Sequence, residues 1–221
     1  MSLLTIVGAG PGMGLAIARL YGQHGFEVAL VARDQDKLGT LVDQLGAEGI
    51  KAKAFQADVA DHASLKNAFN TIKTELGEID VLEFSPSNRE LPMASATEVT
   101  IESIQAWMDF YVYGAVTVVQ QVLPDMLARN SGTLLFTTGA SSVYPNPMLG
   151  NIGIATAGLR NWIHSLHTAV ADKGVQVGHV AINAWIGLQP GAEPENIAQL
   201  YWELYSNRDQ VELVFDPPIG N

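Results

Sequence analysis

The feature of this chain that most constrains its fold is an alternation of short β-branched runs with longer helical patterns. The runs Leu3–Val7 and Glu27–Ala32, for example, are each followed by ten or more residues with helical periodicity. Strands that are separated in this way by helices indicate right-handed βαβ units and therefore a parallel sheet. The second run is apolar throughout its centre, which is typical of a sheet covered on both faces. We therefore predict an α/β fold built on a doubly wound parallel sheet.

The alternation continues along the chain without an internal repeat, a low-complexity segment or a linker. The predicted strands cover residues 3–7, 27–32, 52–57, 80–84, 133–137, 175–182 and 211–215. The predicted helices cover residues 13–23, 35–45, 64–76, 101–129, 154–172 and 194–205. Because 221 residues is an ordinary length for one domain of this class, we predict a single domain over residues 1–221.

Charge and residue usage exclude several classes of function. The chain has 12 Lys and Arg against 23 Asp and Glu, a net charge of −11 that repels nucleic acid. It contains no cysteine, which excludes disulfides, thiolate nucleophiles and cysteine-based zinc sites, and we expect no metal. No apolar stretch approaches the ~20 residues needed to cross a bilayer, and the first residues lack the cationic start of a signal peptide. We therefore expect a cytoplasmic protein without nucleic-acid or membrane partners.

A glycine-rich turn lies between the first predicted strand and the first predicted helix, and it reads Gly8-Ala9-Gly10-Pro11-Gly12-Met13-Gly14. Glycines at this place let the backbone approach a pyrophosphate closely, and the helix N-terminus then points at its negative charge. The flanking strand and helix supply the context that such a motif requires. The turn therefore predicts a Rossmann-type dinucleotide-binding domain.

The end of the second predicted strand indicates which dinucleotide binds. An acidic residue there would hold the ribose 2′-hydroxyl of NAD, whereas an arginine accommodates the 2′-phosphate of NADP. The sequence has Ala32 followed by Arg33, so a cation and no acid stands at this position. We favour NADP(H) over NAD(H); the alternative is that Arg33 is a solvated arginine paired with Asp34 or Asp36.

Several further motifs carry a resemblance to a known family. The glycine spacing Gly8-x3-Gly12-x-Gly14, the pair Asp58-Val59 after the third predicted strand and the run Ala157–Arg160 are similar to those of short-chain dehydrogenases/reductases. The resemblance implies a sheet of about seven parallel strands, a nicotinamide cofactor and reversible reduction of a carbonyl to an alcohol. It also implies that Asp58 and Val59 contact the adenine and that Ile186 contacts the nicotinamide through its backbone.

The resemblance fails at the positions where the family places its catalytic groups. The serine, tyrosine and lysine positions are taken by Gly139, Ile152 and Thr156, and the asparagine position by Tyr111. No Tyr-x-x-x-Lys occurs anywhere in the chain, so a shifted alignment does not recover the motif. Hydride transfer to a carbonyl needs a positioned proton donor, and the sequence therefore predicts a divergent member with a non-standard or impaired site.

Other residues are candidate replacements for the missing proton donor. The main candidates are Tyr111 and Ser141. Further hydroxyls near the end of the fifth predicted strand belong to Thr138, Ser142 and Tyr144. Each has an ordinary structural alternative, as a packed helix residue, strand residue or loop residue. Glu83 in a predicted central strand is either an acid near the site or a structurally paired carboxylate, since a buried carboxylate needs a partner or a raised pKa. His164 and His167 on the helix 154–172 are expected to face solvent or a neighbouring subunit.

Three functions are consistent with these patterns. The leading one is an NADP-dependent oxidoreductase that acts on a small carbonyl or alcohol, and the second is a non-catalytic NADPH-binding sensor or regulatory protein. A Rossmann-type enzyme of another class, such as a methyltransferase, is disfavoured by the glycine spacing and Arg33. We also predict a homodimer or homotetramer, because helices 101–129 and 154–172 carry long apolar stretches and the family packs these two helices against their copies.

Overall fold

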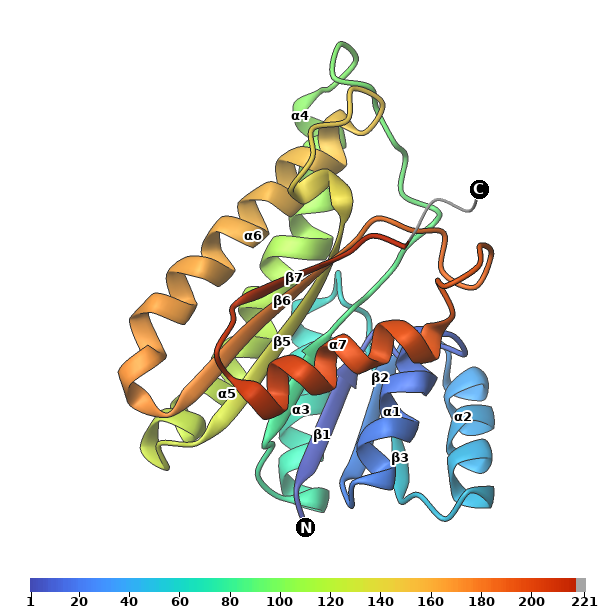
Figure 1. The fold of residues 1–221 in the computed structure, drawn as a ribbon, viewed down its shortest axis with the longest axis vertical. Helices are drawn as coiled ribbons and strands as arrows, with labels where there is room; N and C mark the ends of the chain where they lie inside the picture. The colour runs from blue at the N-terminus through green and yellow to red at the C-terminus, as the bar shows by residue number, and fades with distance from the viewer. Residues whose placement is uncertain (218–221) are drawn as a thin grey trace.

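The computed structural model describes residues 1–217, and it contains one parallel sheet with helices on both faces (Figure 1). The strands are β1 (Leu3–Val7), β2 (Glu27–Ala32), β3 (Ala52–Gln56), β4 (Val81–Phe84), β5 (Gly132–Gly139), β6 (Val175–Ile182) and β7 (Glu212–Phe215). The longer helices are α1 (Met13–Gln23), α2 (Gln35–Ala47), α3 (His62–Leu76), α4 (Ile101–Trp107), α5 (Gly114–Ala128), α6 (Gly150–Val170) and α7 (Pro194–Asn207).

The sheet has seven strands in the order β3-β2-β1-β4-β5-β6-β7, and every neighbouring pair is parallel. The chain order reverses at β1, which pairs with β2 on one side and with β4 on the other. In open sheets of this kind, ligands bind outside the carboxyl ends of the strands at this reversal point. The predicted doubly wound parallel sheet is confirmed.

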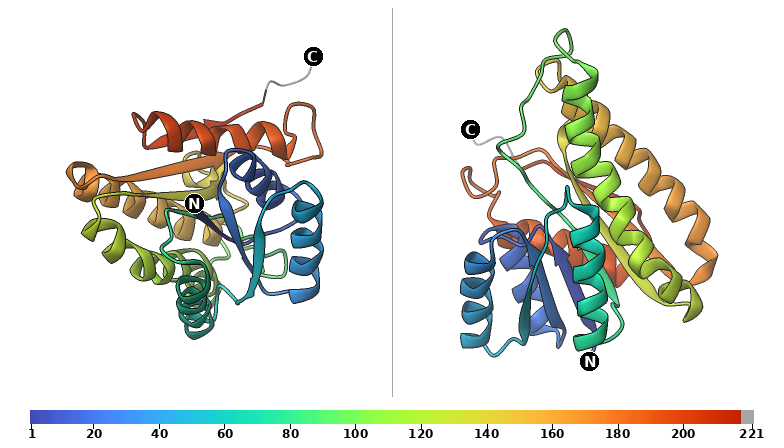
Figure 2. Two further views of the ribbon diagram at one scale, coloured as in Figure 1. Left: turned by 90° about the horizontal axis from the view of Figure 1, so that it is seen from below. Right: turned by 180° about the vertical axis from the view of Figure 1, so that it is seen from behind.

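Helices lie on both faces of the sheet, as the view from below shows (Figure 2), and an apolar layer fills the space between the sheet and the helices on each face. Along β1, Leu3 and Val7 pack with residues of α3, α5 and α6, whereas Leu4 and Ile6 pack with residues of α1, α2 and α7. Side chains alternate between the faces of a strand, so a strand in the centre of the sheet is apolar at nearly every position. This explains why the central strands lack a polar alternation.

Most element bounds agree with the sequence prediction to within two residues, and the larger differences lie in the helices and strand around the second half of the sheet. The predicted helix 101–129 is continuous but contains a π-helical segment, η1 (Met108–Tyr113), between α4 and α5. The helix predicted from residue 154 begins at Gly150, and β5 extends to Gly139 because it pairs with β6 over its whole length. No helix in the described part of the chain is both long enough and apolar enough to span a membrane.

Candidate functional site

The glycine turn lies at the carboxyl end of β1, directly beside the chain that leaves β4. Gly8 has a φ of +96°, a backbone conformation that favours glycine, and a Cβ there would lie 2.6 Å from the backbone nitrogen of Pro86. The backbone N–H groups of Gly8 and Ala9 both donate to the carbonyl of Val31, which fixes the turn against β2. A side chain at Gly8 would therefore clash with the backbone that leaves β4 and displace the turn.

The next glycines leave open space in front of α1. A Cβ at Gly10 or Gly12 would meet no atom within 4 Å, and no side chain of the described residues caps the N-terminus of α1. The first N–H groups of a helix lack intrahelical partners, so an anion placed there gains both hydrogen bonds and a favourable interaction with the helix dipole. Gly14 packs closely against the turn, since its Cβ would lie 3.1 Å from the Cα of Ala9. The turn thus fits a pyrophosphate group.

A cleft opens next to this turn, between the ends of β2, β3 and β4. Four of the predicted cofactor residues line it together with Gly8, namely Gly10, Arg33, Asp58 and Val59. Gly12, Met13 and Gly14 lie at the start of α1, just outside its lining, and Ile186 lies in the loop after β6, away from it. The structure therefore brings the residues predicted for the pyrophosphate and the adenosine half of a dinucleotide to one place.

Arg33 reaches this cleft with little competition for its charge. Its half-exposed side chain forms an ion pair of 3.8 Å with the exposed Glu90. Asp34, which the sequence offered as a partner, instead caps α2 and pairs with Lys37, and these contacts lower the pKa of Asp34. The Arg33 guanidinium is thus held only by a long, solvated contact and is available to an anionic group.

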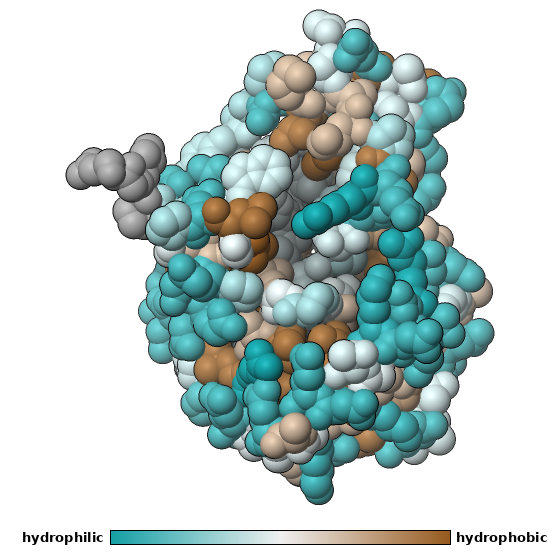
Figure 3. All heavy atoms as spheres, turned by 90° about the vertical axis from the view of Figure 1, so that its right-hand side faces the viewer, coloured by the Kyte–Doolittle hydropathy of each residue, from teal (hydrophilic) through white to brown (hydrophobic). Residues whose placement is uncertain are grey.

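A second and larger cleft, of about 830 Å³, lies at the carboxyl ends of β5 and β6. Figure 3 shows the molecule hollowed at its centre, with hydrophobic and hydrophilic residues around the hollow. Both candidate donors, Tyr111 from η1 and Ser141 from the turn after β5, line this cleft. Gly139 and Ile152, at two of the family's catalytic positions, line it as well. The sequence-predicted site residues after β5 and on α6 are thus brought together.

Tyr111 presents a phenol to this cleft. Its ring stacks on Trp107 at 5.7 Å and 14°, and the Trp107 indole is fixed by donating to the carbonyl of Pro92. The Tyr111 hydroxyl has no hydrogen-bond partner among residues 1–217, and burial raises its pKa to about 12. The group is therefore a protonated phenol that can donate a hydrogen bond to a ligand.

The positions at which the family places its catalytic tyrosine and lysine hold side chains that cannot act as acids in this cleft. Ile152 contributes only an apolar wall. Thr156 is buried, and its hydroxyl donates to the carbonyl of Ile152 on its own helix. Because the Thr156 hydroxyl is hydrogen-bonded to its own helix, it supplies neither the positive charge nor the long side chain of a lysine.

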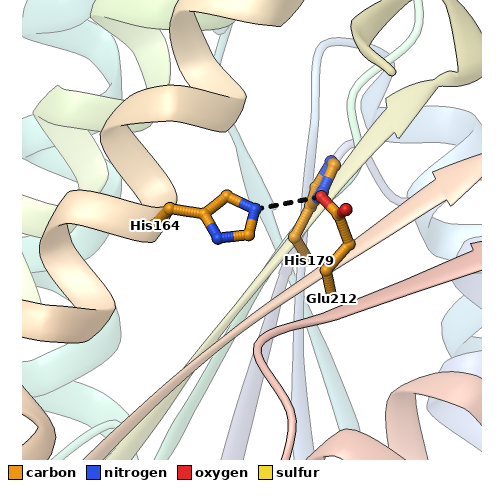
Figure 4. A group of neighbouring side chains, drawn as sticks. All are labelled: His164, His179 and Glu212. Atoms are coloured by element: carbon orange, nitrogen blue, oxygen red, sulfur yellow. Dashed lines mark hydrogen bonds and ion pairs between the residues drawn. The ribbon is translucent and has the colours of Figure 1, made fainter. Parts of the chain in front are cut away.

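Thr138 and Ser142 do not line the cleft, and they lie on the face of the sheet that α6 covers. The two hydroxyls are 2.6 Å apart, and Thr138 also lies 2.8 Å from Nε2 of His179. His179 in turn places Nδ1 2.8 Å from a carboxylate oxygen of Glu212 (Figure 4). These hydroxyls are therefore part of a buried polar network and not of the cleft wall.

This network also gives a partner to one of the two helix histidines. His164 lies 3.1 Å from the same oxygen of Glu212 (Figure 4). Arg160 donates two hydrogen bonds to the two oxygens of that carboxylate. Burial opposes ionisation, but the hydrogen bonds from Arg160, His164 and His179 lower the pKa of Glu212 to about 2. His167 likewise contacts the carbonyl of Val177. Both histidines are partly exposed, and β7 and β6 supply them with partners that no local pattern reveals.

His164, His179 and Glu212 are close enough to hold a metal ion. The guanidinium of Arg160, however, already contacts both oxygens of Glu212, so a cation would have to enter beside a fixed positive charge. The arrangement is that of a closed ion-pair network that ties α6 to β6 and β7.

Glu83 is fully buried in β4, on the face covered by α1 and α7. Burial raises the pKa of Glu83 to about 8, against hydrogen bonds from Ser85 and Thr137 that lower it. Ser85 Oγ donates at 2.9 Å and Thr137 Oγ1 at 3.2 Å, and Thr137 lies 2.6 Å from the hydroxyl of Tyr201. Glu83 is thus partnered structurally and lies outside both cleft linings.

Comparisons with known proteins agree with this geometry. A family model described as short chain dehydrogenase matches residues 3–184. The chain is 26% identical over 174 residues to a short chain dehydrogenase of Pseudocercospora fijiensis, which aligns 77% of this chain and 55% of that protein. It is 26% identical over 178 residues to a 3-oxoacyl-[acyl-carrier-protein] reductase of Staphylococcus epidermidis, with 80% of this chain and 72% of that protein aligned.

The fold is shared with solved structures as well. A metagenomic short-chain oxidoreductase in complex with NADP superposes with a TM-score of 0.85 at 21% identity, over 99% of this chain and 98% of that chain. The family model covers most of the sequence, and the chain folds into one seven-stranded parallel sheet. The chain therefore belongs to the short-chain dehydrogenase family.

Proposed function

We propose that this chain is an NADPH-dependent oxidoreductase that acts on a small carbonyl or alcohol, with a proton supply that departs from the family pattern. The observation that carries the proposal is the pair of clefts at the carboxyl edge of one sheet. One contains the glycine turn and Arg33, and the other contains the phenol of Tyr111 and the hydroxyl of Ser141. Family membership and the NADP complex of a related fold support the cofactor assignment.

The first cleft is proposed to bind the cofactor. Gly10 and Gly12 would allow the pyrophosphate to approach the N-terminus of α1, and Arg33 would pair with the 2′-phosphate. Asp58 and Val59 would contact the adenosine end. When bound, NADPH would supply a hydride to the carbonyl carbon of a substrate in the second cleft.

The second cleft is proposed to orient the carbonyl oxygen and to stabilise its negative charge. Tyr111 and Ser141 are the proposed donors, because both line the cleft and neither hydroxyl has a protein partner in the described chain. For Tyr111, burial keeps the phenol protonated at neutral pH. Its high pKa means that it gives a hydrogen bond readily but releases its proton poorly at neutral pH. Ile152 and Thr156 add no acid, so we expect slow reduction, with a rate that rises toward low pH if solvent supplies the proton.

Turnover measurements test this proposal. We expect NADPH oxidation with a panel of aldehydes, ketones and dicarbonyls to be slow, and Tyr111→Phe to reduce it further while NADPH binding is unchanged. Ser141→Ala is the matched variant at the other hydroxyl. If reduction is fast and neither substitution affects it, both candidate donors are wrong.

A second function is favoured by the loss of all four family catalytic groups. Gly139 has no side chain, Ile152 is apolar, and the hydroxyl of Thr156 is engaged with its own helix. The same cofactor cleft on such a chain would suit a non-catalytic NADPH-binding sensor or regulatory protein. Tight NADPH binding without oxidation of the bound cofactor by any member of the carbonyl panel would favour this function over the first.

A further inference from the structure

The side chains that line the second cleft carry no formal charge. None of the described lining residues is Asp, Glu, Lys, Arg or His. Its walls include three aromatic rings, from Tyr111, Tyr144 and Trp185, and two prolines, Pro145 and Pro147. The chain as a whole has a net charge of −11. An anionic substrate would therefore find no cation in the lining and an unfavourable potential around it.

Each amide side chain in the lining makes one hydrogen bond within the described chain. Asn146 accepts from the backbone N–H of Met148, Asn183 donates to Asp216, and Gln189 accepts from the backbone N–H of Trp185. These contacts shape the loops around the cleft. The hydroxyls of Tyr111, Ser141 and Tyr144 make no hydrogen bond within residues 1–217, so they can donate to the carbonyl oxygen of a ligand.

The mouth of the cleft exposes large apolar surfaces. The side chain of Trp185 is 76% exposed, and Tyr144 on the opposite loop is 50% exposed. Exposed aromatic side chains beside a cavity gain free energy when a flat apolar ligand covers them, through both burial and ring contacts. A cavity of about 830 Å³ is large enough for a ligand of two fused rings next to a nicotinamide.

From these observations, and resting on the proposed function, we propose that the second cleft takes a neutral, flat, largely apolar carbonyl compound, such as an aryl ketone or aryl aldehyde. The carbonyl oxygen would accept hydrogen bonds from Tyr111 and Ser141, and the ring would lie between Tyr144 and Trp185. Carboxylates and phosphates would be rejected, because the lining offers no cation to replace their hydration. Polyhydroxylated carbonyls would bind more weakly, because they have no flat apolar surface to cover Tyr144 and Trp185.

The test compares the binding of three probes to the full-length protein in the presence of NADP⁺, measured by ligand-observed NMR. The probes are 2-acetylnaphthalene, its anionic counterpart 6-acetyl-2-naphthoate, and L-sorbose. We expect the neutral ketone to bind at least tenfold more tightly than the other two. Equal or tighter binding of the naphthoate or of L-sorbose would overturn the proposal.

Three substitutions locate the binding. Trp185→Ala and Tyr144→Ala should each weaken binding of the ketone by about threefold to tenfold, as expected for one lost aromatic contact. Leu188→Ala is the matched control, because Leu188 is 80% exposed on the same loop as Trp185 but does not line the cleft. A loss at Leu188 equal to the loss at Trp185 would place the ketone elsewhere and contradict the proposal.

Binding and turnover separate this inference from the proposed function. If the ketone binds as expected but is never reduced by NADPH, the proposed oxidoreductase activity fails while the ligand class stands. If another class of carbonyl is reduced and the ketone does not bind, the activity stands and the ligand class fails.

Discussion

Replacing Glu83 by glutamine should make the protein more stable, by an amount that depends on pH. Glu83 is fully buried in β4, between Ile6 of β1 and Leu135 of β5, and its pKa of about 8 compares with an ordinary value of 4.5. Between these two values the folded state keeps a proton that the unfolded chain has released. The unfolded state is then favoured by each further rise in pH, so the free energy of unfolding falls across this window.

The magnitude follows from the two pKa values. Below about pH 4.5 the Glu83 carboxyl is protonated in both the folded and the unfolded state, so its titration does not lower the free energy of unfolding. At about 1.4 kcal/mol for each pH unit, the cost is about 1 kcal/mol at pH 5, about 3 kcal/mol at pH 7 and about 4.5 kcal/mol at pH 8.5. Above the folded-state pKa both states are ionised and the cost no longer grows. Glutamine has nearly the same shape and does not titrate, so Glu83→Gln should remove the cost.

Urea unfolding followed by circular dichroism at pH 5, 7 and 8.5 measures the effect. The difference in free energy of unfolding between Glu83→Gln and the wild type should grow over this range from about 1 to about 4.5 kcal/mol. Glu90→Gln serves as the control, because Glu90 is 83% exposed and its substitution should show no such growth. A difference in free energy of unfolding between Glu83→Gln and the wild type that is constant with pH would refute the buried, protonated state. If Glu83→Gln were less stable than the wild type, the hydrogen bonds that Ser85 and Thr137 donate to the carboxyl would outweigh the cost of burying it.

Three further predictions concern the cofactor, the catalytic step and the assembly. Arg33→Ala should lower the preference for NADPH over NADH by about tenfold or more, since a charge-assisted hydrogen bond to phosphate is lost. If the ratio of the two dissociation constants is unchanged, Arg33 does not contact the 2′-phosphate. The double substitution Ile152→Tyr with Thr156→Lys should raise the rate of dicarbonyl reduction at least tenfold, because a positioned acid contributes ~10²–10⁴-fold; no gain in kcat would mean that the cleft does not present the carbonyl to α6. Light scattering at micromolar concentration should give a homodimer or homotetramer, because α6 exposes the apolar side chain of Ile154; a monomer would contradict this.

The fold could be predicted closely because its signals are local. The bounds of β1, α1 and β2 follow from periodicity and from the glycines between them, and the structure has the same bounds. The start of α6 was missed because Gly150 and Gly153 weaken the helical pattern, whereas the structure stabilises this turn through contacts with another segment: the backbone of Gly150 donates to Ala94, and Asn151 accepts from the N–H of the same residue. The π-helical segment has no sequence signature that we could use.

The two clefts differ in how far they could be predicted. The cofactor cleft is built around a contiguous turn and a strand end, so Gly10 and Arg33 could be placed from their spacing alone. The second cleft is assembled from η1, the β5 end, α6 and the loop after β6, and only the sheet order brings Tyr111 and Trp185 to one cavity. The contacts of His179 and Glu212 were missed for the same reason, since β6 and β7 become neighbours only in the folded sheet.

The buried network explains how the second cleft can keep its shape without the family's catalytic groups. Arg160 on α6 is held by Glu212 on β7, and His179 on β6 connects that carboxylate to Thr138 and the turn after β5. These elements carry the walls of the cleft, so their relative positions are fixed by interactions that do not involve residues 139, 152 or 156. A tyrosine introduced at 152 would therefore be mounted on a wall whose position is already set. A lysine at 156 would replace a buried residue that does not line the cleft, so the response of turnover to the double substitution reports on the chemistry of the cleft only in a variant that keeps the wild-type circular dichroism spectrum.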